Sequence, residues 1–487
     1  MKKIISVLLA AAMVLALAAC GGGDAPEQTT PVPSGSAGSE DTEAPTESGR
    51  SIERIEDFGG AEIVVADWYS EDEENTEFST SWQEFVYEHN KSIMEKYNFT
   101  YKIKNIAKTG DYTELVPAKI LSGDTDVQIY YFFQGYILPS VSQNLLWDLN
   151  ELDSFDPADE KWSRISMDTF TFGDKLYAVD VAATEPRIGM FYNKRLLEEA
   201  GLDPELPYDL QKNGEWTWEK FDEICAKVTK DTNSDGITDI WAVSSTYGNM
   251  AVSAVWSNGA AFVSKDDNGR FIDTTGTTEF LQAMEWLQKL AENGWFYAKP
   301  EGGSGNYALE AFQNGTLAFL PYNYWLTDDV YIKECVDDWG WVYCPYGPGA
   351  DGVTMSVQCN GFGIPVSVDK EEAEKIFQAF DLMTDLTAKG ANNDWSVEGA
   401  DEFEETYWQE AWGDVMKDSR AVNETLQSMI FDENTWNLDY YRMIPGYNAT
   451  NYTSDIINLK KTAKEKIEEM RPANEAAVNA ANVLIGN

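Results

Sequence analysis

The chain has 487 residues, with 36 basic and 83 acidic side chains and a formal charge of −47 at pH 7. This charge would repel a phosphate backbone and argues against nucleic acid as a partner. A single histidine, His89, argues against a His-rich zinc site, a haem or a Ser-His-Asp triad. In contrast, 17 Trp, 24 Tyr and 22 Phe supply many flat apolar faces, and the length predicts more than one domain.

The N-terminus is typical of an exported lipoprotein. Two lysines precede an apolar run over 4–17, which is too short to span a bilayer as a permanent helix. Cys20 follows Leu-Ala-Ala, so we expect a signal peptide over 1–19 and lipidation of Cys20; the alternative is an ordinary signal with an incidental cysteine. Segment 20–57 is rich in Gly, Ser, Thr and Pro and predicts a flexible linker to an extracytoplasmic body.

Strands and helices alternate from residue 58 onward, which predicts an α/β fold with parallel strands whose carboxyl ends bind ligand. We expect Thr217 to cap one helix, Gly294 to end another, and Pro472 to interrupt the last one. The predicted strands are 61–66, 100–106, 127–133 and 317–320, segment 363–366 is expected to be extended, and the predicted helices are 82–97, 112–121, 196–201, 218–230, 280–293, 370–386 and 454–470.

The remaining cysteines, Cys225, Cys335, Cys344 and Cys359, show no metal-ligand spacing. Outside the cell a Cys344–Cys359 or a Cys335–Cys344 disulfide could form, and free buried thiols are the alternative.

An acidic segment over 231–239 matches the start of an EF-hand-type loop. Oxygen side chains stand at its positions 1, 3, 5 and 9, with glycine at position 6. We expect a structural Ca²⁺ here, although Ala242 replaces the usual glutamate at position 12. The alternative is an acidic turn without an ion. The expected ligands are Asp231, Asn233, Asp235, Ile237 and Asp239. No catalytic cofactor is expected.

Five segments in a fixed order resemble the family 1 extracellular solute-binding proteins, the substrate-capturing lipoproteins of carbohydrate ABC transporters. They are FGDKLYAV at 172–179, GMFYNKRLLEEAGL at 189–202, WTWEKF at 216–221, AFQNGTLAF at 311–319 and GFGIPV at 361–366. The resemblance implies a two-lobe periplasmic-binding-protein fold of the type II kind, in which each lobe is a mixed, mostly parallel sheet flanked by helices.

The resemblance also implies how the chain is divided. Crossovers between the lobes are expected near 178–183, 359–363 and 443–447. The acidic, Trp-rich segment 392–435 matches no family block and is either an insertion that shapes the site or a surface helix pair. The N-lobe would comprise 58–182 and 361–444, the C-lobe would begin with 183–360, and helices in 445–487 would pack on the C-lobe.

Aromatic side chains gather between residues 322 and 346, and pyranose rings stack on such faces while their hydroxyls bind polar groups. Trp325 resembles the sugar-stacking Trp of the family. We expect Trp68, Tyr69, Phe133 and Gln134 to bind ligand from the N-lobe, Glu185 and Arg187 from the first crossover, and Trp256, Asn258, Tyr322 and Trp325 from the C-lobe.

These observations predict a monomeric, membrane-anchored protein that captures a carbohydrate, in particular an oligosaccharide, and delivers it to the permease subunits of an ABC importer. No catalysis is expected. Two alternatives stay open: a surface-anchored glycoside hydrolase, and a binding protein for a non-sugar solute such as a peptide.

Overall fold

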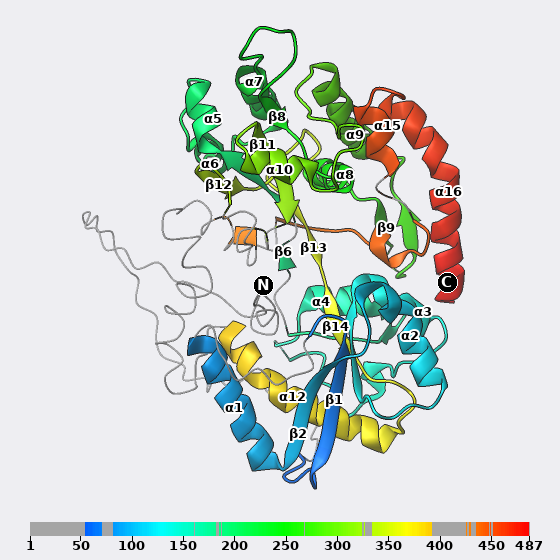
Figure 1. Ribbon diagram of the computed structural model, residues 1–487. Helices are drawn as coiled ribbons and strands as arrows, with labels where there is room; N and C mark the ends of the chain where they lie inside the picture. The colour runs from blue at the N-terminus through cyan, green and yellow to red at the C-terminus, as the bar shows by residue number, and fades with distance from the viewer. Residues whose placement is uncertain are drawn as a thin grey trace, which may run out of the picture.

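The computed structural model forms two α/β lobes, a lower and an upper one in Figure 1. This architecture confirms the predicted fold class. The structure describes residues 54–70, 81–159, 161–181, 185–186, 188–266, 268–323, 334–391, 435–447 and 451–486, together with residues 326, 425, 428, 429 and 449. The expected signal peptide, Cys20 and most of the linker lie outside these residues.

The lower lobe is built on a four-stranded sheet in the order β14-β3-β1-β2. Strand β1 pairs in parallel with β2 and with β3, whereas β14 pairs antiparallel with β3. The strands are β1 (Ala61–Asp67), β2 (Phe99–Asn105), β3 (Ile129–Phe133) and β14 (Asn360–Gly363). The parallel pairing confirms the prediction from alternating strands and helices.

The run Ile63–Ala66 explains β1, since it is apolar throughout and buried on both faces of the sheet. Helix α12 packs on this sheet, with the ring of Phe380 4.9 Å from that of Phe362 in β14. The other elements of the lobe are α1 (Ser81–Tyr97), α2 (Thr109–Leu121), η1 (Gln134–Tyr136), α3 (Leu138–Val141), η2 (Leu149–Glu151), α4 (Arg164–Phe170), the hairpin β4 (Thr171–Phe172) and β5 (Lys175–Leu176), and α12 (Lys370–Ala391).

The upper lobe has a sheet in the order β12-β7-β11-β8, in which β7 is antiparallel to both β12 and β11. Strand β11 pairs in parallel with β8, so this sheet is mixed as expected but is not mostly parallel. Its strands are β7 (Ile188–Asn193), β8 (Trp241–Val243), β11 (Leu317–Asn323) and β12 (Trp339–Val342), and a separate hairpin consists of β9 (Val263–Lys265) and β10 (Phe271–Asp273).

Local signals fix the ends of two upper-lobe helices as predicted. The Thr217 side chain accepts a hydrogen bond from the backbone N–H of Lys220 and caps α7, and Gly294, with φ of +69°, follows α9. The helices are α5 (Lys194–Glu199), α6 (Leu206–Lys212), α7 (Trp218–Val228), α8 (Tyr247–Trp256), α9 (Thr278–Glu292), α10 (Tyr307–Gln313), α15 (Asn451–Ile457) and α16 (Ala463–Leu484).

Three short strands lie between the lobes and pair in one small sheet, and we call them the linking strands (Figure 1). They are β6 (Glu185–Pro186), β13 (Met355–Gln358) and β15 (Trp436–Leu438); β13 is antiparallel to β6 and parallel to β15. Strand β13 continues through Cys359 into β14 of the lower sheet. After β15 the chain forms η5 (Tyr441–Met443), which contacts η1 of the lower lobe.

Two local predictions are wrong. The helix predicted over 454–470 is divided between α15 and α16, because Leu459 adopts a φ of +53° and Thr462 with Glu465 forms a capping box that starts a new helix. Pro472 lies inside α16 and does not interrupt it. The segment expected to be extended over 363–366 begins at the end of β14 and includes a bridge between Pro365 and Leu146, and Val366 stands in a turn. Among the described residues, no helix is both long and apolar enough to cross a membrane.

Candidate functional site

Five half-buried aromatic side chains gather at the carboxyl ends of β1 and β3, where parallel sheets bind ligands. We call Trp68, Tyr69, Tyr131, Phe133 and Tyr136 the aromatic cluster. The ring of Trp68 lies nearly parallel to that of Tyr131, with centroids 5.7 Å apart and an interplanar angle of 12°. Tyr136 meets Trp68 edge-on at 5.1 Å, and Phe133 meets Tyr136 at 5.3 Å. The cluster therefore offers a rigid surface of flat apolar faces.

Hydrogen bonds below the cluster hold Trp68 in place. Oδ1 of the buried Asp67 accepts bonds from the backbone N–H and the hydroxyl of Ser70, at 3.2 and 2.7 Å, which closes the turn after β1. The buried Tyr112 hydroxyl donates to the carbonyl of Ala66 at 2.9 Å, and its ring meets Trp68 edge-on at 5.3 Å. Burial raises the pKa of Tyr112 well above its usual value, so this donor keeps its proton.

An exposed guanidinium borders the cluster. Arg442 in η5 stands over Phe133, 6.0 Å from the ring centroid, and its Nε–H donates to the Tyr441 hydroxyl at 3.0 Å. Burial raises the pKa of Tyr136, and the charge of Arg442 opposes that shift. Within the described part of the chain, no carboxylate forms an ion pair with Arg442. The remaining guanidinium donors are therefore available for an acceptor outside the chain.

Gln134, a predicted ligand residue, forms hydrogen bonds to Cys359 and Asp439, which follow the linking strands β13 and β15. It is 3% exposed, and its Oε1 accepts the backbone N–H of Cys359 at 3.0 Å. Its own backbone N–H donates to the Cys359 carbonyl, and its Nε2 donates to the carbonyl of Asp439 at 3.4 Å. These bonds favour a structural role for Gln134.

Two predicted C-lobe residues lie in the interior of the upper lobe. Trp256 is 2% exposed, and its Nε1–H donates to Oδ2 of Asp439 at 2.9 Å. Asn258 is fully buried; its Oδ1 accepts the backbone N–H of Gly349 at 2.8 Å, and its Nδ2 donates to the carbonyl of Glu279 at 2.7 Å. The internal hydrogen bonds of both side chains favour structural roles.

The other predicted ligand residues are placed only in part. Tyr322 is half-buried near the end of β11, opposite Gly189 of β7. Glu185 lies in the linking strand β6 opposite Gln358, and its side chain is outside the described structure. Arg187, Trp325 and most of the acidic segment 392–435 lie outside the described residues. The structure thus brings together Trp68, Tyr69 and Phe133 among the predicted residues.

The acidic loop folds on its own backbone. Oδ1 and Oδ2 of Asp231 accept the N–H groups of Ser234 and Gly236, at 2.7 and 2.8 Å. Asn233 and Asp235 accept from the N–H groups two residues further on, and Asp239 accepts from both the N–H and the hydroxyl of Thr232, whose bonds lower the pKa of Asp239. Ile237 is 67% exposed. Within the described structure, no three His, Cys, Asp or Glu side chains are grouped so as to hold a metal ion.

The four cysteines that the structure describes form no disulfide. Cys225, Cys335, Cys344 and Cys359 are all free thiols in the structure, and burial raises the pKa of Cys335 and of Cys344 to about 12. The structure therefore supports the alternative without disulfides, and the raised pKa of Cys335 and of Cys344 suppresses the reactivity of these two thiols at neutral pH.

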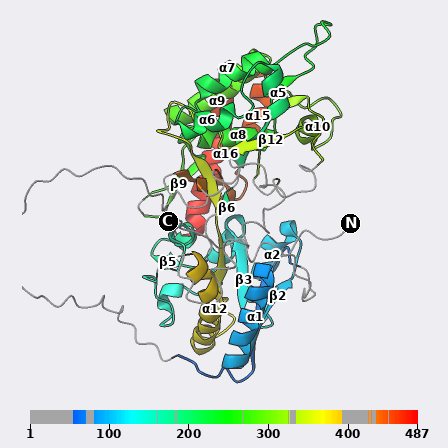
Figure 2. The same ribbon diagram turned by 90° about the vertical axis from the view of Figure 1, so that its left-hand side faces the viewer.

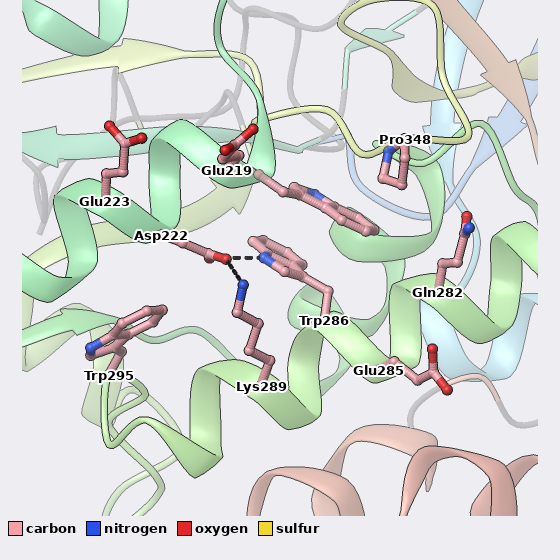
Figure 3. Close-up of a pocket in the computed structure, with 10 residues that line it drawn as sticks. Glu219, Asp222, Glu223, Gln282, Glu285, Trp286, Lys289, Trp295 and Pro348 are labelled. Carbon is pink, nitrogen blue, oxygen red and sulfur yellow. Dashed lines mark hydrogen bonds and ion pairs between the residues drawn. The ribbon is translucent and has the colours of Figure 1, made fainter.

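A surface pocket of about 580 Å³ lies on the upper lobe between α7 and α9, away from the aromatic cluster (Figure 3). Trp218 and Trp286 stack there, 4.5 Å apart at an angle of 2°, but each is less than 8% exposed. Asp222 accepts from Trp286 Nε1 at 3.1 Å and pairs with Lys289 at 2.5 Å. Because both Trp side chains are buried, unlike the half-buried rings of the aromatic cluster, and Asp222 is paired, this arrangement joins two helices and offers little to a ligand.

The sequence reasoning missed Tyr131, Tyr136, Tyr441 and Arg442. Tyr131 could have been found, since strand alternation places it on the same face as the predicted Phe133. The other three lie in the short 3-10 helices η1 and η5, and the packing of η5 against η1 brings Arg442 to Phe133.

Two α/β lobes joined by paired strands, with an aromatic surface at the edge of one sheet, are the architecture of a solute-binding protein. The family model described as bacterial extracellular solute-binding protein matches residues 72–392. The chain therefore belongs to this family, which confirms the resemblance found in the sequence and the predicted location outside the cytoplasm.

Solved structures share the fold at low sequence identity. The cyclic α-maltosyl-1,6-maltose binding protein of Arthrobacter globiformis is 17% identical, with a TM-score of 0.58 over 88% of this chain and 100% of that one. A Staphylococcus aureus solute-binding protein in complex with maltose is 15% identical, with a TM-score of 0.58 over 86% and 98%. UgpB of Mycobacterium tuberculosis in complex with glycerophosphocholine is 14% identical, with a TM-score of 0.56 over 87% and 99%. A comparison with curated proteins found no match.

Proposed function

We propose that this protein captures a carbohydrate, in particular an oligosaccharide, outside the cell and delivers it to an ABC importer. The parallel stack of Trp68 on Tyr131 at the carboxyl edge of the lower sheet is the observation that carries this proposal. Pyranose rings present C–H faces that pack on such aromatic planes, and Arg442 beside the cluster can donate to sugar hydroxyls. Among the structural neighbours, one is named for binding a cyclic maltosyl-maltose and another holds maltose.

In this proposal the protein is a monomer that performs no catalysis, and its partners are the carbohydrate and the permease subunits. The lobes close on the sugar by rotation about the linking strands, with the lobe boundaries expected from the sequence. The proposed ligand residues are those of the aromatic cluster, which includes Tyr131 and Tyr136, together with Arg442. We also keep four ligand residues predicted from the sequence, Glu185, Arg187, Tyr322 and Trp325.

One observation favours a second candidate, a glycerophosphodiester. Arg442 has no carboxylate partner in the described structure and could hold a phosphate, while the aromatic faces of Trp68 and Tyr136 could hold a quaternary ammonium group. The neighbour UgpB binds glycerophosphocholine on the same fold.

A thermal-shift screen of the mature protein tests the proposal. A ligand that binds only the native state increases the free energy of unfolding and so raises the melting temperature. At a ligand concentration one hundred times the dissociation constant, the free energy of unfolding increases by about 2.7 kcal/mol. We expect a shift with α-linked oligosaccharides and none with glycerophosphocholine or short peptides, and no cleavage products after long incubation. A shift with glycerophosphocholine alone would favour the second candidate, and released sugars would identify a hydrolase.

The lipid anchor is proposed from the sequence around Cys20. A thioether-linked diacylglycerol needs the thiol, so the Cys20→Ser variant should carry no lipid and should either stay unprocessed or leave the membrane. Membrane fractionation with metabolic labelling by a radioactive fatty acid measures both effects. Processed, unlabelled Cys20→Ser protein that stayed firmly on the membrane would contradict the proposal.

A structural Ca²⁺ in the loop 231–239 is also proposed. Ion binding would replace several of the loop's internal hydrogen bonds to side-chain oxygens, and Asp235 would supply one ligand. A chelator should lower the melting temperature of the parent protein by a few degrees and leave Asp235→Ala nearly unchanged. Equal responses of the two proteins, or no response of the parent, would exclude the ion.

A further inference from the structure

A lysine of the upper lobe reaches across to the lower lobe. Nζ of Lys265, in β9, donates to the backbone carbonyls of Asp168, Thr169 and Thr171 at 3.2, 2.7 and 3.1 Å. The three acceptors end α4 and begin β4, where carbonyls lack partners in the helix. Only a protonated amine has the three N–H donors that these carbonyls use.

Aromatic rings from both lobes enclose this amino group. It lies 4.7 Å from the ring centroid of Phe172 in the lower lobe, 5.6 Å from that of Phe271 in the upper lobe, and 4.6 Å from that of Tyr440 beside the linking strand β15. Burial lowers the pKa of Lys265 to about 7, so the cost of desolvating the charge offsets much of what these bonds contribute. Such a contact can break without a large loss of free energy.

The two hairpins that carry these residues touch directly. A Cβ on Gly269, between β9 and β10, would lie 3.2 Å from the backbone N of Gly173, between β4 and β5. The rings of Phe172 and Phe271 are 6.3 Å apart. We call the contact formed by Lys265, Phe271 and Gly269 with Asp168, Thr169, Thr171, Phe172 and Gly173 the hairpin contact.

The hairpin contact and the aromatic cluster lie on opposite sides of strand β14, which continues from the linking strand β13. Strand β14 pairs on one edge with β3, which leads to the cluster, and on its other edge with Val179, which follows the hairpin of β4 and β5. Figure 2 shows the same arrangement, with β9 and β5 on one side of β6 and with β3 and α2 on the other. A rotation about the linking strands that brings the upper lobe toward the cluster therefore separates the two hairpins.

We propose that the hairpin contact, with Lys265 at its centre, is a built-in restraint that holds the two lobes apart on the side of the aromatic cluster. Closure on a ligand breaks the three hydrogen bonds from Lys265 to backbone carbonyls. The free energy needed to break this contact therefore lowers the affinity for a ligand that the contact never touches. The inference concerns the motion of the lobes and does not depend on which solute binds.

Distance measurements between the lobes of the ligand-free protein test this restraint. Spin labels attached through a ketone-bearing unnatural residue at the exposed positions 114 in α2 and 310 in α10 report closure without modifying the cysteines. Figure 2 shows these two helices on the side of β6 where β3 lies. Lys265→Met keeps the apolar stem and removes the donors. It should raise the ratio of short to long distances about fivefold, which corresponds to one hydrogen bond of about 1 kcal/mol net.

Lys227→Met is the matched control, because Lys227 is an exposed lysine on α7 of the same lobe, and its distances should equal those of the parent. Lys265→Gln retains two N–H donors and should give an intermediate shift. It also serves if Lys265→Met fails to fold, which circular dichroism would reveal. Distances unchanged in the folded Lys265 variants, or shifted toward longer values, would overturn the restraint.

Discussion

Trp68→Ala should weaken binding of the best oligosaccharide of the thermal-shift screen roughly 10- to 150-fold. Losing the ring removes a stacking face and leaves apolar sugar surface in water, at a cost of about 1.5–3 kcal/mol. Calorimetric titration measures the loss. Because Trp68 is half-buried and lies in the turn after β1 rather than within the sheet, we expect the variant to keep its circular dichroism spectrum.

Trp295→Ala provides the control for this prediction. Trp295 is also a half-buried tryptophan, but it lines the pocket on the upper lobe, away from the cluster. Its removal should leave the affinity within about twofold. If Trp68→Ala bound as tightly as the parent while folded, the stacking surface would have to lie elsewhere, and Trp325 would be the next residue to test.

Asp439→Asn should lower the free energy of unfolding by about 2–4 kcal/mol, measured by urea denaturation. Asp439 is 4% exposed, and its two oxygens accept four N–H donors, those of Trp256 Nε1, Phe262, Val263 and Tyr441, at 2.8–3.2 Å. An asparagine side chain turns an N–H₂ group toward donors, so at least one of them stays buried without an acceptor. The residue joins β15 to α8 and β9, so the upper lobe depends on it.

The difference in the free energy of unfolding between the parent and Asp439→Asn depends on pH, and the pKa of Asp439 fixes the direction of this dependence. Burial raises the pKa of Asp439 to about 6, against about 3.9 in the unfolded chain, so the native state holds the proton more tightly between these values. The stabilisation that Asp439 contributes to the native state is therefore fully present below about pH 4 and is lost as the pH rises through 6. The excess stability of the parent over Asp439→Asn should be larger at pH 4.5 than at pH 7.

Asp57→Asn is a control whose effect on stability should depend on pH in the opposite direction. Bonds from the Gly59 N–H and from Asn98 lower the pKa of this exposed carboxyl, so its small contribution is present at pH 7 and is lost as the pH falls. An excess stability of the parent over Asp439→Asn that grew from pH 4.5 to pH 7 would contradict the assigned burial of Asp439.

Local patterns in the sequence predicted the framework. The apolar run before Asp67 predicted β1, Thr217 predicted the start of α7, and the alternation over 100–106 predicted β2. Such signals depend on neighbouring residues, which is why they can be read along the chain. The same reading placed Trp68 and Phe133 at the carboxyl ends of their strands, where the structure has the aromatic cluster.

Contacts between distant segments could not be predicted in this way. Trp256 and Asp439 are 183 positions apart, and nothing near either residue shows that their side chains meet in the interior. The separation of Gln134 from Cys359 is 225 positions. Polar and aromatic side chains at strand ends suit a ligand and an internal hydrogen bond equally well, and only the packing of the linking segment decides between them. For the same reason Arg442 was missed.

A crystal structure of the mature protein with the oligosaccharide that gives the largest thermal shift tests the central claim most directly. The account predicts a sugar ring stacked on Trp68 and Tyr131, a hydrogen bond from Arg442 to a sugar oxygen, and lobes that meet around the ligand. A sugar bound only in the pocket beside Trp218 and Trp286, or an aromatic cluster covered by protein in the complex, would contradict it.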